Sequence, residues 1–333
     1  MKAMIINQFS DIPFFEEATL AVPSVLPGHV LIKVMASSVN PLDCKLRKGV
    51  FPDLVPSFPA ILHGDVAGRV EAVGEGVTQF SVGDEVYGCA GGLCGMGGAL
   101  ADYMLADAAL LAKKPKTLSF AESAALPLVS LTAWEGLISY ANLQKGQRVL
   151  VHGGTGGVGH LALQLAKYLG AQVFTTSSTD EKMALSKKLG ADVAINYRKT
   201  DVKSYIKQYT NDAGFDLVFD TVGGKNLPDC FQAASLFGKV ISILAAGQYD
   251  LTPAFSKGLT LHTIMQPLPL ITRLRRAHYG EILMKIAYLV DQGSIHPLLD
   301  HQTFNFNDVG KAHFHLESGK AIGKIVLTGF SNV

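Results

Sequence analysis

The chain has 333 residues and nearly balanced charge, with 29 Lys and Arg against 28 Asp and Glu and a formal net charge of +1. A chain of this length exceeds what one hydrophobic core usually supports, so we expect two domains. Its basic residues form no long run apart from the short cluster Arg273, Arg275 and Arg276. This argues against nucleic acid as a main partner.

The amino terminus and the cysteines point to a protein that is not exported. The sequence MKAMIINQFSDIP has too few apolar residues for a signal-peptide core, and no window approaches about 18 uncharged apolar residues. The four cysteines, Cys44, Cys89, Cys94 and Cys230, form no C-x-x-C pair, as expected of reduced thiols. We therefore expect no membrane span and a cytoplasmic location.

The first part of the chain, residues 1–120, consists of short β-branched runs broken by Gly, Pro and Asp. The clearest runs are Val30–Val34, Val66–Val73 and Asp84–Tyr87. Short strands between frequent turn residues are typical of a β-rich, barrel-like domain. The sequence therefore predicts such a domain at this end of the chain.

From Phe120 onward helices alternate with strands, as in a doubly wound parallel sheet. The expected strands lie at Arg148–Val151, Gln172–Thr176, Val193–Asn196, Asp216–Phe219, Lys239–Leu244 and Thr260–Ile264. Ligands of such sheets bind at the carboxyl ends of the strands. Leu244 and Ala245, at the expected end of the fifth strand, are therefore candidate cofactor contacts.

The strand at Arg148–Val151 runs directly into the turn Gly154-x-Gly156-x-x-Gly159. This pattern is typical of a turn that lays a dinucleotide pyrophosphate on a helix N-terminus. We expect Gly154 to make the tight turn, Gly156 to let backbone N–H groups approach the phosphates, and Gly159 to let the helix pack close to the strand. The cofactor-binding residues predicted here are Gly154, Thr155, Gly156, Gly157, Val158 and Gly159.

The residues after this turn complete a strand–helix–strand unit. Apolar side chains recur at helical spacing from Val158 to Leu169, and Gly170 stands where the helix should end. A second strand, Ala171–Thr176, follows, so the unit fits the roughly 30 residues that a βαβ motif needs. This context favours a dinucleotide site over a glycine-rich turn without a ligand.

The end of the second strand indicates NADPH rather than NADH. An NAD-selective site has Asp or Glu there, about 20 residues beyond the first glycine, whereas this chain has Thr176, Ser177 and Ser178. Hydroxyl groups can donate to a 2′-phosphate, and Lys182 can neutralise its charge. Ser178 and Glu181 also fit a capping box that starts a helix, and Lys182 also fits a solvated helix lysine.

After Gln266 the chain passes through a proline-interrupted segment, an expected helix at about His278–Val290 and short strands that end in Gly323–Leu327. These last strands read as a continuation of the first domain. We therefore expect a dinucleotide-binding domain of residues 124–266, inserted into a domain built from residues 1–123 and 267–333. The active site would then lie in the cleft between the domains, where ligand sites are common.

Several long motifs occur in one order along nearly the whole chain. They are SVNPLD (Ser38–Asp43), GDVAGRVEAVGEGVTQFSVGDEVYG (Gly64–Gly88), ALPLVSLTAWEGL (Ala125–Leu137), HGGTGGVGH (His152–His160), LGAD (Leu189–Asp192), FDTVGG (Phe219–Gly224) and GKIVLT (Gly323–Thr328). In these motifs the sequence resembles the medium-chain dehydrogenase/reductase superfamily, within it the zinc-free NADPH:quinone oxidoreductase group that includes zeta-crystallin. The resemblance implies an α/β protein with a GroES-like, β-rich catalytic domain and a Rossmann domain.

The zinc alcohol dehydrogenases of that superfamily bind a catalytic metal through a Cys, a Gly-His-Glu triplet and a further Cys. Here Asn40 stands in place of the first Cys, and the triplet reads HGD, with Gly64 where the ligand histidine belongs. An amide and a glycine cannot supply the ligands that zinc needs, so we expect no metal. His63 is interpreted as a hydrogen-bonded histidine, and Cys89 and Cys94 as free thiols.

The resemblance also implies site residues. Asn40 would lie near the nicotinamide and ribose, where its amide can donate to a developing oxyanion. Asp43 and Lys45 follow as further catalytic candidates, with a salt-bridged, solvated turn as the alternative. Lys324 is a cofactor candidate, with an ordinary surface lysine on the last strand as the alternative. The remaining implied cofactor contacts are Thr132, which could instead cap or pack, Tyr197, Asp220, Thr221 and Val222.

We therefore expect a zinc-independent, NADPH-dependent enzyme that reduces quinones by hydride transfer. Two alternatives stay open: a reductase of α,β-unsaturated carbonyls with the same cofactor site, and a non-catalytic NADPH-binding protein of the crystallin type. The resemblance implies a homodimer or homotetramer joined through the dinucleotide-binding domain, with the strand Thr260–Ile264 as the sheet edge involved. The expected partners are thus a small quinone or enone and further copies of the chain.

Overall fold

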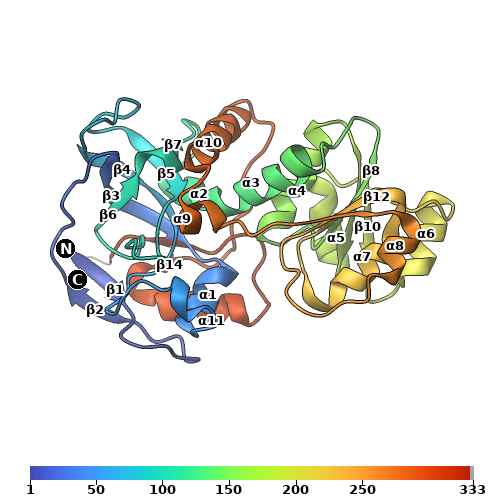
Figure 1. Ribbon diagram of the computed structural model, residues 1–333, viewed down its shortest axis with the longest axis horizontal. Coiled ribbons are helices and arrows are strands. Elements are labelled where there is room, and N and C mark those ends of the chain that lie inside the picture. Colours follow the sequence, from blue (N-terminus) through green and yellow to red (C-terminus); the bar gives the residue numbers. More distant parts are fainter. Residues whose placement is uncertain (331–333) are drawn as a thin grey trace. The chain divides into compact units, whose positions relative to one another are not determined.

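The computed structural model describes residues 1–330, and the chain folds into two compact units (Figure 1). Unit 1 comprises Met1–Leu128 and Pro267–Val333, of which the last three residues lie outside the described part. Unit 2 comprises Val129–Gln266. Unit 1 is therefore made from both ends of the chain.

Unit 1 is rich in β-structure, as its sequence predicts. A seven-stranded sheet has the order β14-β15-β3-β4-β5-β7, with β6 paired to β3, and β1 and β2 form a two-stranded sheet. The strands are β1 (Lys2–Ile5), β2 (Glu16–Thr19), β3 (His29–Ser38), β4 (Asp65–Val73), β5 (Glu85–Cys89), β6 (Tyr103–Asp107), β7 (Leu111–Lys113), β14 (Phe304–Asn305) and β15 (Val326–Thr328).

The carboxyl-terminal strand β15 lies antiparallel to β3, with Val326 opposite Ser38. A strand from the carboxyl-terminal part of the chain thus pairs with the sheet formed by β3 to β7 of the amino-terminal part. The helices and 3₁₀ turns of unit 1 are α1 (Pro41–Arg47), η1 (Pro52–Leu54), η2 (Ala108–Leu110), α2 (Phe120–Ala124), α9 (Leu268–Thr272), α10 (Arg276–Asp291), η5 (Phe306–Asp308) and α11 (Val309–Glu317). Helix α3 (Pro127–Trp134) begins at the boundary between the units.

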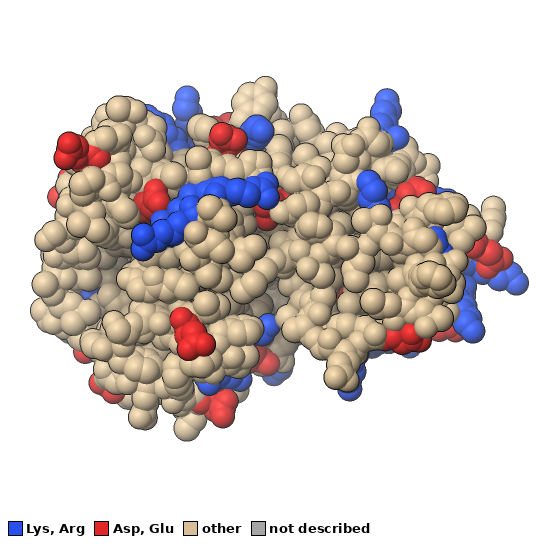
Figure 2. Space-filling model, viewed as in Figure 1, with Lys and Arg blue, Asp and Glu red and all other residues tan. Residues whose placement is uncertain are grey.

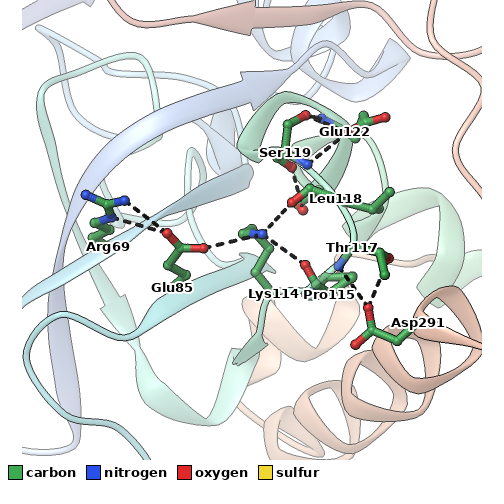
Figure 3. Close-up of polar contacts among 10 residues, drawn as sticks. Arg69, Glu85, Lys114, Pro115, Thr117, Leu118, Ser119, Glu122 and Asp291 are labelled. Atoms are coloured by element: carbon green, nitrogen blue, oxygen red, sulfur yellow. Dashed lines mark hydrogen bonds and ion pairs between the residues drawn. The ribbon is translucent and has the colours of Figure 1, made fainter.

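A buried lysine shapes the loop that follows β7 (Figure 3). The ammonium group of Lys114 donates to the carbonyl oxygens of Pro115 and Leu118 and pairs with Glu85 at 3.4 Å. Glu85 also accepts from Arg69 on β4 at 3.1 Å. A buried ammonium is tolerated only when carbonyls and a carboxylate replace its water, so these contacts hold the loop in one conformation.

Unit 2 contains a six-stranded sheet in the order β10-β9-β8-β11-β12-β13. All neighbouring strands are parallel, which confirms the predicted doubly wound, Rossmann-type sheet. The strands are β8 (Arg148–His152), β9 (Gln172–Ser177), β10 (Val193–Asn196), β11 (Phe215–Asp220), β12 (Ala234–Ser242) and β13 (Thr260–Thr263). Its helices and turns are the π-helix η3 (Glu135–Tyr140), α4 (Gly157–Tyr168), α5 (Asp180–Lys188), α6 (Val202–Thr210), η4 (Gly224–Asn226), α7 (Leu227–Ala233) and α8 (Thr252–Lys257).

Two local predictions in unit 2 are wrong. Thr179, not Ser178, is the N-cap of α5, because its side chain accepts from the backbone N–H of Lys182. Ser178 and Glu181 therefore form no capping box. Strand β12 ends at Ser242, so Leu244 and Ala245 lie in the loop beyond the strand rather than at its end.

In the glycine-rich turn after β8, the tight turn is made by a different glycine from the one predicted. Gly153 has a φ of +71° and makes the turn, whereas Gly154 lies against β9, where a Cβ atom would come 2.3 Å from the Thr175 hydroxyl. Gly159, predicted to let the helix pack on the strand, instead lies against the turn, since a Cβ there would lie 2.1 Å from the carbonyl oxygen of Gly153. Close packing of the helix start on the turn therefore requires glycine at this position.

Charged side chains on the face shown in Figure 2 gather in one short blue stripe and are otherwise interspersed among uncharged residues. Within residues 1–330, none of the helices combines the length and the apolar character needed to cross a bilayer.

Replacing Gly159 with Ala should lower the free energy of unfolding by about 1–3 kcal/mol, because the added methyl group would collide with the Gly153 carbonyl. Urea unfolding of the purified protein measures this. Gly97→Ala is the control, since a Cβ atom there would meet no atom within 4 Å. Equal stability of the two variants would contradict the close packing described for the turn.

Candidate functional site

Three of the predicted site residues meet in unit 1, although they come from opposite ends of the chain. Asn40 caps the start of α1, and its backbone N–H donates to the Asp43 carboxylate at 2.7 Å. The Lys324 ammonium donates to Oδ1 of Asn40 and, at 3.0 Å, to the carbonyl oxygen of Val39. The three side chains are buried.

Asp65 organises this cluster, and our interpretation of the sequence missed it. One carboxylate oxygen accepts from Ser38 Oγ at 2.7 Å and from Asn40 Nδ2 at 2.8 Å, and it pairs with Lys324 at 3.4 Å. The other oxygen accepts from the backbone N–H of Leu128 at 2.9 Å. The sequence held a signal, because Asp65 is the acidic member of the triplet that we interpreted only as a failed metal site.

These contacts fix which way the Asn40 amide faces. A carboxylate can only accept and an ammonium can only donate, so Nδ2 must face Asp65 and Oδ1 must face Lys324. Nδ2 lies 2.8 Å from the Asp65 carboxylate, and the Asn40 side chain also hydrogen-bonds to the Asp43 carboxyl. The arrangement therefore holds the amide in one orientation, with its NH₂ group facing carboxyl groups and its oxygen facing the ammonium.

The interpretation of Lys324 as an ordinary surface lysine is wrong. Its side chain is 3% exposed, and it precedes β15 instead of lying on that strand. Two acceptors and the Asp65 carboxylate replace the water that the ammonium loses. Removing one partner of a buried ion pair typically costs about 3–5 kcal/mol, so this cation and Asp65 depend on each other.

The solvated-turn interpretation of the α1 segment is wrong for Asp43, which is buried in the first turn of that helix. Burial, with a smaller contribution from the nearby Asp65 carboxylate, raises the pKa of the Asp43 carboxyl to about 7 against the opposing hydrogen bonds from Asn40. Lys45 is half-buried and stands two residues further along α1. Residues at that spacing do not face each other on a helix, so Lys45 lies away from the cluster.

His63 is hydrogen-bonded, as the sequence analysis expected. Its ring is buried, with Nδ1 3.3 Å from Ser37 Oγ and Nε2 2.9 Å from Nε2 of His313. Among residues 1–330, no group of three or more His, Cys, Asp or Glu side chains is arranged to hold a metal ion. Within residues 1–330, neither Cys89 nor Cys94 forms a disulfide.

The predicted cofactor residues of unit 2 gather along one edge of its sheet. The turn from Gly154 to Gly159 follows the carboxyl end of β8, Ser177 ends β9, Tyr197 follows β10, and Asp220 ends β11. Thr221, Val222, Leu244 and Ala245 continue from β11 and β12 at the same edge, while the buried Thr132 lies on α3. Because parallel strands point the same way, these segments share the edge at which such sheets bind ligands.

The ends of β9 and β10 bring three candidate residues close together. The backbone N–H of Tyr197 donates to the carbonyl oxygen of Ser177, which places Tyr197 beside Ser178. Lys182 lies in the first turn of α5 and is half-buried. Ser177 differs from these residues, because its hydroxyl is buried against Ser186 Oγ at 3.2 Å.

Asp220 shapes the loop after β11 through its carboxylate. Oδ1 accepts from the backbone N–H groups of Val222 and Gly223 and from Asn226 Nδ2, and Oδ2 accepts from Ser242 Oγ at 2.9 Å. The side chain is fully buried. Asp220 thus fixes the conformation of Thr221 and Val222, and its own oxygens are occupied by the protein.

Two family models match the chain. A model of the alcohol dehydrogenase GroES-like domain matches residues 26–116, and a model described as zinc-binding dehydrogenase matches residues 157–267. The 2-methylene-furan-3-one reductase of Solanum lycopersicum is 35% identical over 98% of this chain and 79% of its own length. The quinone oxidoreductase of Homo sapiens is 30% identical over 92% of this chain and 91% of its own.

The chain belongs to the medium-chain dehydrogenase/reductase superfamily, in its zinc-free quinone reductase group. It is therefore an oxidoreductase of that superfamily with an NAD(P)-binding dehydrogenase fold. The NADPH-dependent alkenal/one oxidoreductase of Arabidopsis thaliana chloroplasts is also similar, with 33% identity over 98% of this chain and 79% of its own length.

Solved structures of the superfamily share the fold. An alcohol dehydrogenase superfamily protein from Novosphingobium aromaticivorans is 39% identical, with a TM-score of 0.93 over 98% of this chain and 99% of its own. A mycobacterial protein crystallised with NADPH is 29% identical, with a TM-score of 0.87 over 98% of this chain and all of its own. The fold and the superfamily inferred from the sequence are thus confirmed.

The raised pKa of Asp43 predicts that the variant Asp43→Asn is stabilised relative to the unmodified protein by an amount that increases with pH. Between about pH 4 and pH 7 the folded protein holds a proton on Asp43 that the unfolded chain releases, so this residue lowers stability as the pH rises and the loss is complete above about 7. An amide does not ionise. The melting temperature of the variant relative to the unmodified protein should therefore be higher at about pH 8 than at about pH 5.

Thermal unfolding monitored by circular dichroism at the two pH values measures this difference. Asp53→Asn is the control, because it removes the same charge at an exposed position. A difference in melting temperature between the Asp43 variant and the unmodified protein that stays constant with pH would contradict the raised pKa.

Proposed function

We propose that this protein is a zinc-independent, NADPH-dependent reductase that transfers hydride to a quinone. The observation that carries the proposal is the buried Asn40 amide, held in one orientation by Asp65 and Lys324. An oriented donor of this kind stabilises an oxygen on which negative charge develops. The 30% identity to human quinone oxidoreductase supports a quinone as the acceptor.

The turn after β8 fits the pyrophosphate of a dinucleotide. Gly156 is the extended N-cap of α4, and the first N–H groups of that helix have no partner within the helix. A Cβ at Gly156 would approach the Gly153 carbonyl to 3.2 Å, so a side chain there would crowd the turn and require it to shift slightly. We propose that the segment from Gly154 to Gly159 binds the pyrophosphate through these N–H groups and the helix dipole.

The edge formed by β9 and β10 suits the 2′-phosphate of NADPH. Ser178, Lys182 and Tyr197 lie there, and the end of β9 carries no Asp or Glu to accept from a ribose hydroxyl. Ser177 is the weaker candidate, because its hydroxyl bonds to Ser186. The similarity to a mycobacterial protein crystallised with NADPH supports this cofactor.

A bound NADPH would supply the hydride, and the chain would supply orientation and a hydrogen-bond donor. We propose that Asn40 shares its NH₂ group with the substrate oxygen while Asp65 keeps the amide in its orientation. Lys324 donates to Oδ1 of the same amide, and this polarises the amide and makes its N–H a stronger donor. Asp43 then acts as a positioning residue, since it holds the backbone N–H of Asn40.

The roles proposed for the other predicted residues rest on their positions in the sequence and the sheet. Asp220 would act through the loop it fixes, presenting Thr221 and Val222 to the cofactor. Leu244 and Ala245 follow β12 at the same edge. For Lys45 and Thr132 the proposal has no support beyond their family positions.

The hypothesis of zinc independence is supported by Asn40 and Gly64, which stand at positions that bind the metal in the zinc enzymes. Both polar atoms of the Asn40 side chain are already engaged, by Asp65 and Lys324. Gly64 has no side chain, and a Cβ there would lie 2.9 Å from the carbonyl oxygen of Gly91. These positions therefore support a hydrogen-bonded site in place of the metal site of the zinc enzymes.

A second candidate function is the reduction of an α,β-unsaturated carbonyl. The observation that favours it is the 35% and 33% identity to a 2-methylene-furan-3-one reductase and an alkenal/one oxidoreductase. Hydride addition to the β-carbon of an enone also places negative charge on the carbonyl oxygen. The same Asn40 donor would therefore serve both substrate classes.

The substrate class can be tested by NADPH consumption with a naphthoquinone, phenanthrenequinone and short alkenals as separate acceptors. We expect turnover with at least one quinone. Turnover with alkenals alone would favour the second function, and NADPH binding without turnover would favour a non-catalytic role. Metal analysis of the same preparation should give well under one zinc per chain, whereas a stoichiometric ion would contradict zinc independence.

Replacing Lys182 with Ala should weaken NADPH binding about tenfold and NADH binding less than about twofold, because a lost charge-assisted hydrogen bond to the 2′-phosphate costs about 1.5–3 kcal/mol. Titration of tryptophan or cofactor fluorescence gives both dissociation constants. Lys187→Ala, an exposed lysine in the last turn of α5, is the matched control. Equal losses for the two cofactors would remove Lys182 from the phosphate site.

A further inference from the structure

Four buried side chains of unit 1 form a continuous hydrogen-bonded chain that ends at Asp65. Cys44 Sγ lies 3.4 Å from Nδ1 of His313, and the Nε2 atoms of His313 and His63 are 2.9 Å apart. Nδ1 of His63 lies 3.3 Å from Ser37 Oγ, and the Ser37 hydroxyl donates to the backbone carbonyl oxygen of Asp65 at 2.7 Å. The chain joins α1, α11 and the strands β3 and β4.

Hydrogen counting gives this chain a single direction. The Asp65 carbonyl can only accept, so the Ser37 hydroxyl must donate its hydrogen bond there. Ser37 Oγ therefore accepts from Nδ1–H of His63. A neutral His63 then has a lone pair on Nε2, which accepts from Nε2–H of His313. Nδ1 of His313 is left to accept the thiol proton of Cys44.

The charges around the chain keep it in this neutral form. Burial lowers the pKa of His313 to about 3, helped by the Arg47 guanidinium. Burial, His313 and the Lys324 ammonium together hold the pKa of His63 well below its ordinary value. Burial also raises the pKa of the Cys44 thiol to about 12, so its proton stays available.

The chain cannot conduct a proton to a substrate, because it ends at a backbone carbonyl. What it holds is the backbone on either side of Gly64. His63 has a φ of +72°, a conformation that costs a non-glycine residue about 1–3 kcal/mol and persists only where its surroundings enforce it. Gly92 packs against the His63 backbone so closely that a Cβ there would lie 2.7 Å away. The imidazole contacts thus help to fix the segment that carries Asp65.

We infer that His63 and His313 are positioning residues for the Asn40 amide, acting through the one-directional chain that fixes the Asp65 segment. The inference rests on the proposed role of that amide as an oxyanion donor. Asp65 links the hydrogen-bonded chain to the amide, since its carbonyl ends the chain and its carboxylate accepts from Asn40 Nδ2 at 2.8 Å. A displaced Asp65 would leave Asn40 with its donor misdirected.

Nitrogen-15 NMR of the full chain, with labelled histidine and asparagine, tests the geometry without any substrate. We expect His63 to carry its proton on Nδ1 and His313 on Nε2, and each signal is identified from a His→Gln variant. The opposite tautomer at His63 would overturn the inference. The side-chain NH₂ signal of Asn40, identified from Asn40→Asp, reports the orientation of the amide.

Variants then test whether the chain positions that amide. His313→Phe removes the central donor while keeping a ring beside Phe15. It should shift the Asn40 NH₂ signal and lower kcat by about 10- to 100-fold, with the dissociation constant of NADPH changed less than about twofold. His315→Phe is the matched control, because it also loses a buried hydrogen bond from α11, to Asp300, but lies outside the chain. It should leave the signal unchanged and kcat within about twofold.

Two substitutions at Cys44 cover the case in which His313→Phe does not fold. Cys44→Ser keeps a donor for His313, whereas Cys44→Ala removes it. The serine variant should match the unmodified protein and the alanine variant should move in the direction of His313→Phe. If His313→Phe or Cys44→Ala folds and leaves both the Asn40 signal and kcat unchanged, the inference is overturned. If the unmodified protein turns over no acceptor, the proposed function fails while the Asn40 signal still decides the positioning role.

Discussion

A buried ammonium group must find anions and carbonyls in place of water, and in unit 1 this requirement falls on Lys324. It is met by the Val39 carbonyl, the Asn40 amide oxygen and the Asp65 carboxylate. None of these partners can move far without leaving a charge unpaired in the interior. The geometry of β3, the start of α1 and the start of β4 is therefore tied to one cation supplied from the other end of the chain.

The same requirement gives the Asn40 amide its direction. An isolated asparagine can rotate by half a turn and exchange donor for acceptor at little cost. Here an anion lies on one side and a cation on the other, so only one orientation satisfies both. Metal enzymes of the superfamily orient a substrate oxygen with a Lewis acid. Under the proposed function, fixed charges acting through the Asn40 amide would perform that task.

The sequence predicted the parts of the fold that depend on local pattern. Apolar periodicity and glycine spacing located the parallel strands and the turn after β8, because neighbours along the chain determine both. Prediction from the sequence failed where contacts between residues far apart in the chain determine the structure. Lys324 was expected at the surface as one alternative, since its partner Asp65 lies 259 residues away. Gly154 packs against Thr175 of β9 while Gly153 makes the turn, and this depends on a contact that no local pattern reveals.

The closing strand β15 makes unit 1 dependent on both ends of the chain. During synthesis, residues 129–266 leave the ribosome together and can fold as a domain while Lys324 has not yet been translated. Asn40 and Asp65 have by then already left the ribosome, and the Asp65 carboxylate still lacks the cation with which it pairs in the folded chain. A chain that stops before Lys324 would keep its nucleotide-binding sheet yet lack the cation that orients the amide. The Asn40 amide would thus take its final orientation only after Lys324 has been synthesised.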